Sequence, residues 1–219
     1  MNKGDFYMDG KQKLLLRYKE ENQTAVKGEI VFAGSSLMEG LPIGELLAEH
    51  GDDTVIYNRG VGGFVTDELL AALDVCVLDL KPRRIFINIG TNDLSNPNLT
   101  IEQVMEKYDA IITAIEKALP KVEIYMMAYY PINIDAAIEE IKPNLRIRTN
   151  EKITLANAQV EQLALCHGQR YIDVNDNLKD ECGRLKAEYT YEGMHIKKCG
   201  YAAIYDDLMR YVKEPEWKK

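Results

Sequence analysis

The 219-residue sequence has no block of lysines or arginines, no long apolar run and no cysteine pair at metal-ligand spacing. Acidic residues outnumber basic ones by 35 to 27, for a formal net charge of -8. Nucleic acids and anionic membrane surfaces need a basic footprint, so neither is an expected partner. The longest apolar run, Ile124 to Tyr130, is too short to cross a bilayer but suits a buried strand. No stable membrane association is expected, which leaves small molecules or other proteins as partners.

The cysteines and the N-terminal residues indicate where the protein resides. Cysteines stand at positions 76, 166, 182 and 199, with no CxxC motif and no paired histidines that would complete a zinc site. The pattern is typical of free thiols. The first ten residues include Lys3 and Asp5 and have no apolar core of a signal peptide. We therefore expect a cytoplasmic protein.

Segments of strand and helix character alternate along the chain, as in a parallel α/β sheet covered on both faces. The predicted strands are Glu29–Gly34, Thr54–Asn58, Arg84–Gly90, Val122–Tyr130 and Tyr171–Val174. The predicted helices are Lys11–Glu21, Thr66–Leu80, Ile101–Leu119, Asn150–Cys166 and Lys197–Val212. We expect one domain over 1–219, with a leading helical segment at 1–28. Two stretches with little periodicity, Asn175–Ile196 and Pro131–Thr149, are of a length that usually carries function.

Polar and glycine-rich residues follow the predicted strands, at the edge where parallel sheets bind ligands. The segments are Gly34-Ser35-Ser36-Leu37, Asn58 to Gly63, Gly90-Thr91-Asn92-Asp93 and, before the last helix, Glu192-Gly193-Met194-His195. Together they offer a hydroxyl, exposed backbone, a carboxamide and an acid–base pair, which is the set that acyl transfer needs.

Each of these residue types has a place in ester hydrolysis. Ser36, at a helix start, is the candidate nucleophile, and His195 is the base that would take its proton. Glu192 would hold the other ring nitrogen of the histidine. The N–H groups of Ser36, Gly63 and the Asn92 side chain would face the developing oxyanion.

The four segments resemble the blocks of the SGNH hydrolases, the GDSL-type esterases and lipases that include acylhydrolases similar to platelet-activating-factor acetylhydrolase. The resemblance runs from Ile30 to about Tyr201. It implies a three-layer flavodoxin-like α/β fold with a five-stranded parallel sheet, an oxyanion hole of Ser36, Gly63 and Asn92, no metal and no cofactor.

Two positions depart from the family pattern. Ser35 stands where the first block has aspartate, and Glu192 stands where the last block has aspartate. Glu192 keeps the charge but adds a methylene, so its carboxylate must approach His195 from a different rotamer or backbone position. If it did not, His195 would rely on a backbone carbonyl or on water.

Each candidate also has a structural interpretation. Ser36 with Glu39 forms a capping-box pattern, and Asn92 with Asp93 fits an Asx-turn. Glycines 60, 62 and 63 suit a tight turn, and Val65 stands where a dinucleotide fingerprint has its third glycine.

Three further residues are candidate substrate contacts. Tyr129 and Tyr130 end the fourth predicted strand at the same edge, where they would line an acyl or leaving-group pocket or belong to the core. Arg59 would meet an anionic or hydroxyl group of the substrate, or pair with a surface carboxylate.

The sequence thus predicts a serine esterase for short acyl esters, O-acetyl groups among them, with a small-molecule ester as substrate. The alternatives are a binding protein that keeps the fold without turnover, supported by Ser35 and Glu192, and a phosphate-binding flavodoxin-like domain, which leaves His195 unexplained. The sequence leaves open whether the chain forms a homo-oligomer.

Overall fold

A five-stranded parallel sheet forms the centre of the computed structural model, which describes residues 9–217. The strands are β1 (Ile30–Gly34), β2 (Ile56–Gly60), β3 (Arg84–Asn88), β4 (Glu123–Met127) and β5 (Arg170–Ile172). Their order is β2-β1-β3-β4-β5, and every neighbouring pair is parallel. The order reverses direction at β1 and β3, and ligands of such sheets bind at this switch point. The predicted flavodoxin-like α/β fold is confirmed.

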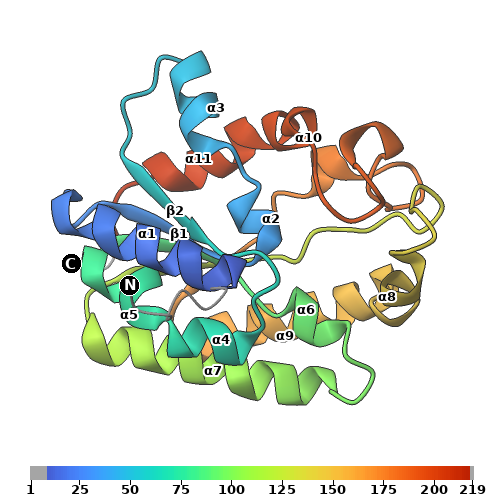
Figure 1. The fold of residues 1–219 in the computed structure, drawn as a ribbon, viewed down its shortest axis with the longest axis horizontal. Helices are drawn as coiled ribbons and strands as arrows, with labels where there is room; N and C mark the ends of the chain where they lie inside the picture. Colours follow the sequence, from blue (N-terminus) through green and yellow to red (C-terminus); the bar gives the residue numbers. More distant parts are fainter. Residues whose placement is uncertain (1–8, 218–219) are drawn as a thin grey trace, which may run out of the picture.

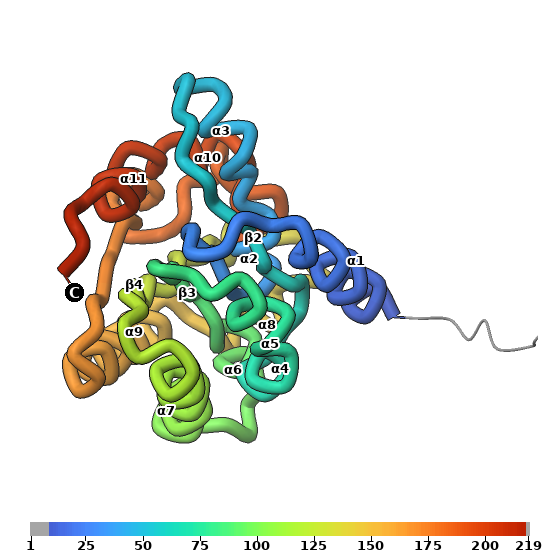
Figure 2. Tube along the Cα trace, turned by 90° about the vertical axis from the view of Figure 1, so that its left-hand side faces the viewer, coloured from blue at the N-terminus to red at the C-terminus, as the bar shows by residue number. Residues whose placement is uncertain are grey.

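Helices cover both faces of the sheet (Figures 1 and 2). One layer contains α1 (Gly10–Thr24), α4 (Thr66–Ala71), α5 (Leu73–Cys76), α7 (Ile101–Ala118) and α9 (Asn150–Cys166). The other contains α2 (Ser36–Glu39), α3 (Ile43–Glu49), α10 (Lys198–Ala203) and α11 (Tyr205–Lys213). Short helices α6 (Thr91–Leu94) and α8 (Lys142–Ile147) lie in the connections after β3 and β4, and 3-10 turns lie at Leu78–Leu80, Asp176–Leu178 and Ala187–Tyr189.

Alternating side chains of β1 supply two separate cores. Ile30 and Phe32 pack on the side of α2, α3, α10 and α11, whereas Val31 and Ala33 pack on the side of α7 and α9. Successive side chains of a strand point to opposite faces, so a strand buried on both sides is apolar throughout. All five residues of β1 are buried.

Several predicted boundaries were wrong. The second strand lies two residues later than Thr54–Asn58, at Ile56–Gly60. The predicted helix Thr66–Leu80 is broken into α4, α5 and a 3-10 turn, which Lys81 ends in a left-handed conformation with φ 45°. The predicted helix Lys197–Val212 is interrupted at Ile204, which separates α10 from α11. Helix α3 was not predicted at all.

The long segment Asn175–Ile196 is more ordered than a loop of little periodicity. It contains two 3-10 turns and two antiparallel bridges, Lys179 to Leu185 and Thr190 to Ile196. The second bridge closes the turn that carries Glu192 and His195, so the fold itself shapes this part of the candidate site.

The leading helical segment expected at 1–28 is represented by α1, while residues 1–8 lie outside the described part of the chain. All four cysteines are free thiols. Among residues 9–217, no helix is both long enough and apolar enough to cross a membrane.

Candidate active site

Ser36 lies directly beyond β1, at the switch point of the sheet. Ser35 is the residue that precedes α2, and Ser36 is the first residue inside that helix. Neither residue's side chain caps the helix, so the capping interpretation of Ser36 with Glu39 is wrong. Ser36 is half-buried, and its hydroxyl is free to face a neighbour on another segment.

The structure brings Ser36, His195 and Glu192 into one hydrogen-bonded row. His195 Nε2 lies 3.0 Å from Ser36 Oγ, and His195 Nδ1 lies 2.6 Å from Glu192 Oε1. The same Glu192 oxygen accepts the backbone N–H of His195 at 3.0 Å. The Glu192 side chain is 13% exposed and that of His195 is 39% exposed. The longer glutamate therefore reaches the imidazole, and the geometry is that of a nucleophile, a base and an orienting acid.

The turn that carries this pair is held by Thr190. Its Oγ1 accepts the N–H of Gly193 at 2.8 Å and donates to the carbonyl of His195 at 2.9 Å. Gly193 has φ 91°, and an added Cβ would lie 2.4 Å from the carbonyl oxygen of Asn133. Only glycine fits here, because the turn needs a positive φ and packs closely on the segment after β4.

Helix α2, which carries Ser36, is fixed by side chains from β2 and α10. Asn58 Nδ2 donates to the carbonyls of Met38 at 2.6 Å and Leu41 at 3.0 Å. Tyr201, on α10, donates its hydroxyl to the carbonyl of Leu37 at 2.6 Å. Buried polar contacts of this kind hold α2, and Ser36 with it, in one orientation.

Side chains of the segment Gly90–Asp93 are hydrogen-bonded to Phe64 and Thr66, just after the segment Asn58–Gly63. Asn92 Nδ2 donates to the carbonyl of Phe64 at 2.9 Å, which leaves the other amide hydrogen without a partner in the described chain. The buried Asp93 carboxylate accepts the backbone N–H and the hydroxyl of Thr66, at 3.0 and 2.7 Å. Burial raises the pKa of Asp93 and the bonds from Thr66 oppose this. Gly63, with φ 72°, is exposed.

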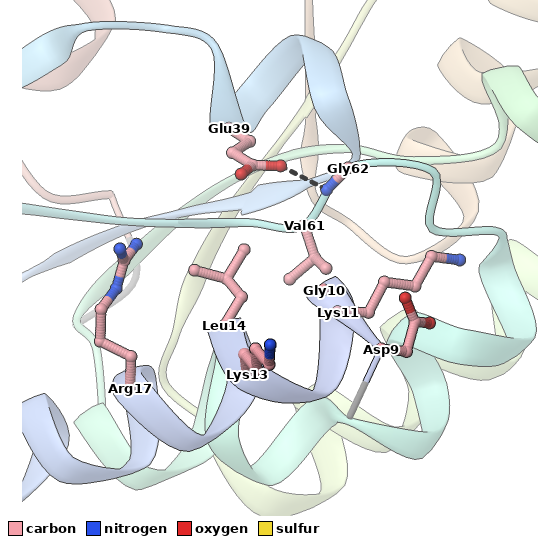
Figure 3. A pocket seen from close by; sticks show the side chains of 9 residues that line it. All are labelled: Asp9, Gly10, Lys11, Lys13, Leu14, Arg17, Glu39, Val61 and Gly62. Carbon is pink, nitrogen blue, oxygen red and sulfur yellow. Dashed lines mark hydrogen bonds between the residues drawn. The ribbon is translucent and has the colours of Figure 1, made fainter. Parts of the chain in front are cut away.

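Two hollows adjoin Ser36. A pocket of about 330 Å³ has Ser36 and His195 in its wall, together with Pro42, Tyr191, Ile196 and Tyr201. A wider cleft of about 650 Å³ lies between α1 and Glu39, Val61 and Gly62, and Figure 3 shows the side chains that line it. A Cβ on Gly62 would lie 3.9 Å from the Cβ of Ser36, so the Gly62 side of the cleft adjoins Ser36.

The wall of the cleft in Figure 3 carries charges of both signs. Glu39 Oε2 accepts the Gly62 N–H, while Lys11, Lys13 and Arg17 project from α1. Because its N–H is engaged by Glu39, Gly62 is not a free donor for a substrate.

Each of the three candidate substrate contacts had two interpretations, and the structure supports the structural one in place of a substrate contact. Arg59 is 4% exposed; it pairs with Glu21 at 3.1 Å and with the Asn22 side chain, so it anchors α1. Burial lowers the pKa of Arg59 and Glu21 opposes this. Tyr129 and Tyr130 are buried in the two cores, and the Tyr129 hydroxyl bonds the carbonyl of Ile89. The predicted fourth strand ran to Tyr130, whereas β4 ends at Met127, and both tyrosine side chains pack in the core.

The other two histidines lie at helix ends, away from the site. The ring of His50 bonds the carbonyl of Leu46 at 2.8 Å as α3 ends. His167, which ends α9, lies between Asp109 at 2.7 Å and Glu116 at 2.9 Å on α7. No cluster of three or more metal-binding side chains occurs within residues 9–217.

Sequence reasoning did not find the residues that support the site. Thr190 and Tyr201 have no motif of their own, and Asn58 was noted only as the first residue of its block. Their partners are backbone carbonyls and N–H groups of segments far away in the chain, so only the folded arrangement identifies them.

Comparison with known proteins shows the family of the chain. Residues 32–203 match the GDSL-like Lipase/Acylhydrolase family, and the chain belongs to that family. Among its relatives is the platelet-activating factor acetylhydrolase IB subunit alpha1 of Rattus norvegicus, 24% identical over 80% of this chain and 71% of the rat protein.

Solved structures share the fold. A Streptococcus pneumoniae protein described as a candidate platelet activating factor has 33% identity and a TM-score of 0.82, over 92% of both chains. An acetylxylan esterase from Geobacillus stearothermophilus has 15% identity and a TM-score of 0.64, over 87% of this chain and 96% of its own. The latter similarity concerns the fold alone.

Proposed function

We propose that this protein is a serine esterase that hydrolyses short acyl esters, O-acetyl groups among them, through an acyl-enzyme on Ser36. The observation that carries the proposal is the row in which Ser36 Oγ, His195 and Glu192 are joined at 3.0 and 2.6 Å. Membership of an acylhydrolase family supports a hydrolytic role for this row.

In the acylation step, Ser36 Oγ attacks the ester carbonyl carbon while His195 Nε2 takes the hydroxyl proton. Glu192 accepts the Nδ1 hydrogen, which leaves Nε2 as the acceptor and stabilises the imidazolium. The tetrahedral oxyanion is bound by the N–H groups of Ser36, Gly63 and the Asn92 amide. The ester C–O bond then breaks, and the alcohol leaves with the proton held by His195.

In the deacylation step, His195 Nε2 takes a proton from water as the water oxygen attacks the Ser36 acyl ester. A second tetrahedral intermediate forms in the same oxyanion site. It collapses to the carboxylic acid, and Ser36 Oγ regains its proton from His195. No redox partner or further reactant is required.

The size of the pocket beside Ser36 supports a short acyl group. Its volume of about 330 Å³ lies at the small end of the range for ligand sites. Part of its wall is apolar, from Pro42, Ile196 and Tyr201, as an acetyl methyl group requires. The substrate is therefore proposed to be a small-molecule ester.

A serine-directed fluorophosphonate tests the proposal, with intact mass and peptide mapping as the readout. We expect one adduct, on Ser36, that Ser36→Ala abolishes and His195→Ala nearly abolishes. Ser95→Ala, which removes a hydroxyl that bonds the carbonyl of Thr91 within the α6 turn, serves as the matched control and should label normally. If wild type gives no adduct under conditions that label a known serine esterase, a binding protein without turnover becomes the better assignment.

A further inference from the structure

A buried arginine lies between two segments of the proposed active site. Arg148 directly follows α8 and is 2% exposed. Its Nη1 donates to the carbonyl of Thr91 at 3.1 Å, and Thr91 precedes Asn92 in the block assigned to the oxyanion. The Nε and Nη2 groups of Arg148 have no hydrogen-bond partner within residues 9–217.

An uncompensated guanidinium in a protein interior is strongly unfavourable, so a counter-charge is expected nearby. Burial lowers the pKa of Arg148 to about 10, and the negative charge of Glu192 opposes that shift. The guanidinium therefore remains charged at neutral pH. Glu192 is the carboxylate whose negative charge acts on Arg148.

The Glu192 carboxylate binds His195 through one oxygen only. Both of its hydrogen bonds, to the ring and to the backbone of His195, use Oε1. Oε2 accepts no hydrogen bond from the described residues. The two side chains make no direct ion pair in this structure, so the attraction between their charges acts at longer range.

The segment after β4 already contacts both parts of the site. The N–H of Asn133 donates to the carbonyl of Gly193 at 2.8 Å, beside Glu192. At the other end of the segment, Lys152 Nζ donates to the carbonyl of Leu94, and Arg148 bonds Thr91. The segment thus joins the turn that carries the base to the helix that carries Asn92.

We propose that Arg148 is a positioning residue of the active site, whose charge orients the Glu192 carboxylate while its hydrogen bond fixes the Thr91–Asn92 block. The inference rests on the proposed esterase function. The positioning role explains why a charged side chain is buried among the segments of the proposed active site. It also gives the negative charge of Glu192, which binds His195 through Oε1 alone, a second positive partner.

A double-mutant cycle with Arg148→Met and Glu192→Gln tests the inference in ester hydrolysis. We expect Arg148→Met to lower kcat with little change in KM, because the residue does not contact substrate. In the Glu192→Gln background, Arg148→Met should lower kcat by a smaller factor than in wild type. The two factors should differ by roughly 2- to 150-fold, the range of coupling between interacting groups. Arg148→Lys, which keeps the charge, should recover part of kcat. Arg146→Met is the matched control, because this exposed arginine lies two residues away and should leave kcat unchanged.

Thermal unfolding of the same variants gives a second readout that does not depend on activity. Glu192→Gln leaves Arg148 without its counter-charge, so Arg148→Met should lower the Tm less in that background than in wild type. If Arg148→Met does not fold, the cycle is run with Arg148→Gln, which also removes the charge.

The outcomes separate this inference from the proposed function. The positioning role would be overturned if the double variant showed no coupling, so that the losses in kcat multiply and the losses in Tm add. It would also be overturned if Arg148→Lys were as impaired as Arg148→Met. A wild-type protein that hydrolyses no ester, with coupling still present in Tm, would instead reject the esterase and retain the Arg148–Glu192 pair.

Discussion

Replacing Glu192 with glutamine removes one charge from the proposed catalytic row of Ser36, His195 and Glu192 and leaves its shape nearly intact. Glu192 Oε1 accepts two N–H groups of His195, one from the ring at 2.6 Å and one from the backbone at 3.0 Å. A glutamine must keep its oxygen at this position to satisfy both donors. Its amide nitrogen then takes the place of Oε2, and the imidazole keeps the tautomer in which Nε2 accepts the Ser36 proton.

The expected loss in kcat follows from the charge that the substitution removes. A hydrogen bond to a charged group contributes about 1.5–3 kcal/mol, which corresponds to roughly 10- to 150-fold in rate when that contribution develops with the imidazolium. Inversion of the tautomer would raise the loss to about 10⁴-fold. We expect Glu192→Gln to lower kcat by about 10²-fold, because the backbone N–H of His195 opposes that inversion.

The assay is steady-state hydrolysis of p-nitrophenyl acetate, with the active sites counted by fluorophosphonate titration. Glu181→Gln, an exposed glutamate on the same long segment, is the matched control and should match wild type. A Glu192→Gln rate within twofold of wild type would refute the orienting role. A loss as deep as that of Ser36→Ala would refute the reasoning about the tautomer.

Three further predictions concern other parts of the chain. Asn92→Ala should lower kcat by about 10²- to 10³-fold in the same assay, and a wild-type rate would reject its oxyanion role. Burial lowers the pKa of His167, but hydrogen bonds to two α7 carboxylates outweigh this and raise it overall. That stabilisation is present below about pH 6.5 and is lost as the pH rises through the pKa of His167 in the folded protein. In urea unfolding, His167→Gln should therefore lower the free energy of unfolding more at pH 5.5 than at pH 8.5. An equal loss at both pH values would contradict this. Gly60→Ala would place a Cβ 2.2 Å from the α2 backbone and should destabilise the fold by about 1–3 kcal/mol. Gly44 has open space around it, so Gly44→Ala should not destabilise the fold. Equal Tm values for the two variants would argue against this packing.

The row of Ser36, His195 and Glu192 was predictable because its signals are local. Ser36 directly follows the first strand, and His195 lies in the segment between the last strand and the last helices, and parallel strands bring the segments after them to one edge. Glu192 lies three residues before its partner, within the same turn. Helices α7 (Ile101–Ala118) and α9 (Asn150–Cys166) were also predictable from their helical periodicity, and in the structure a threonine side chain caps the start of each.

The rest depends on contacts that a sequence does not display. Arg59 follows the second strand as a site residue would, yet α1 packs over it and Glu21 takes its charge. Tyr129 and Tyr130 end an apolar run, and only the packing of both helix layers decides that they are buried. The break in Thr66–Leu80 has no proline or glycine to mark it, so periodicity alone extended the helix too far.

Ser36 and His195 stand 159 residues apart in the chain. The entropy cost of closing a loop grows with its length, so contacts between nearer residues cost less to form than this one. If Ser36 is the nucleophile proposed above, its hydroxyl becomes reactive only when the chain has brought His195 to it. The rate at which a fluorophosphonate labels Ser36 during refolding would then report when this long-range contact forms.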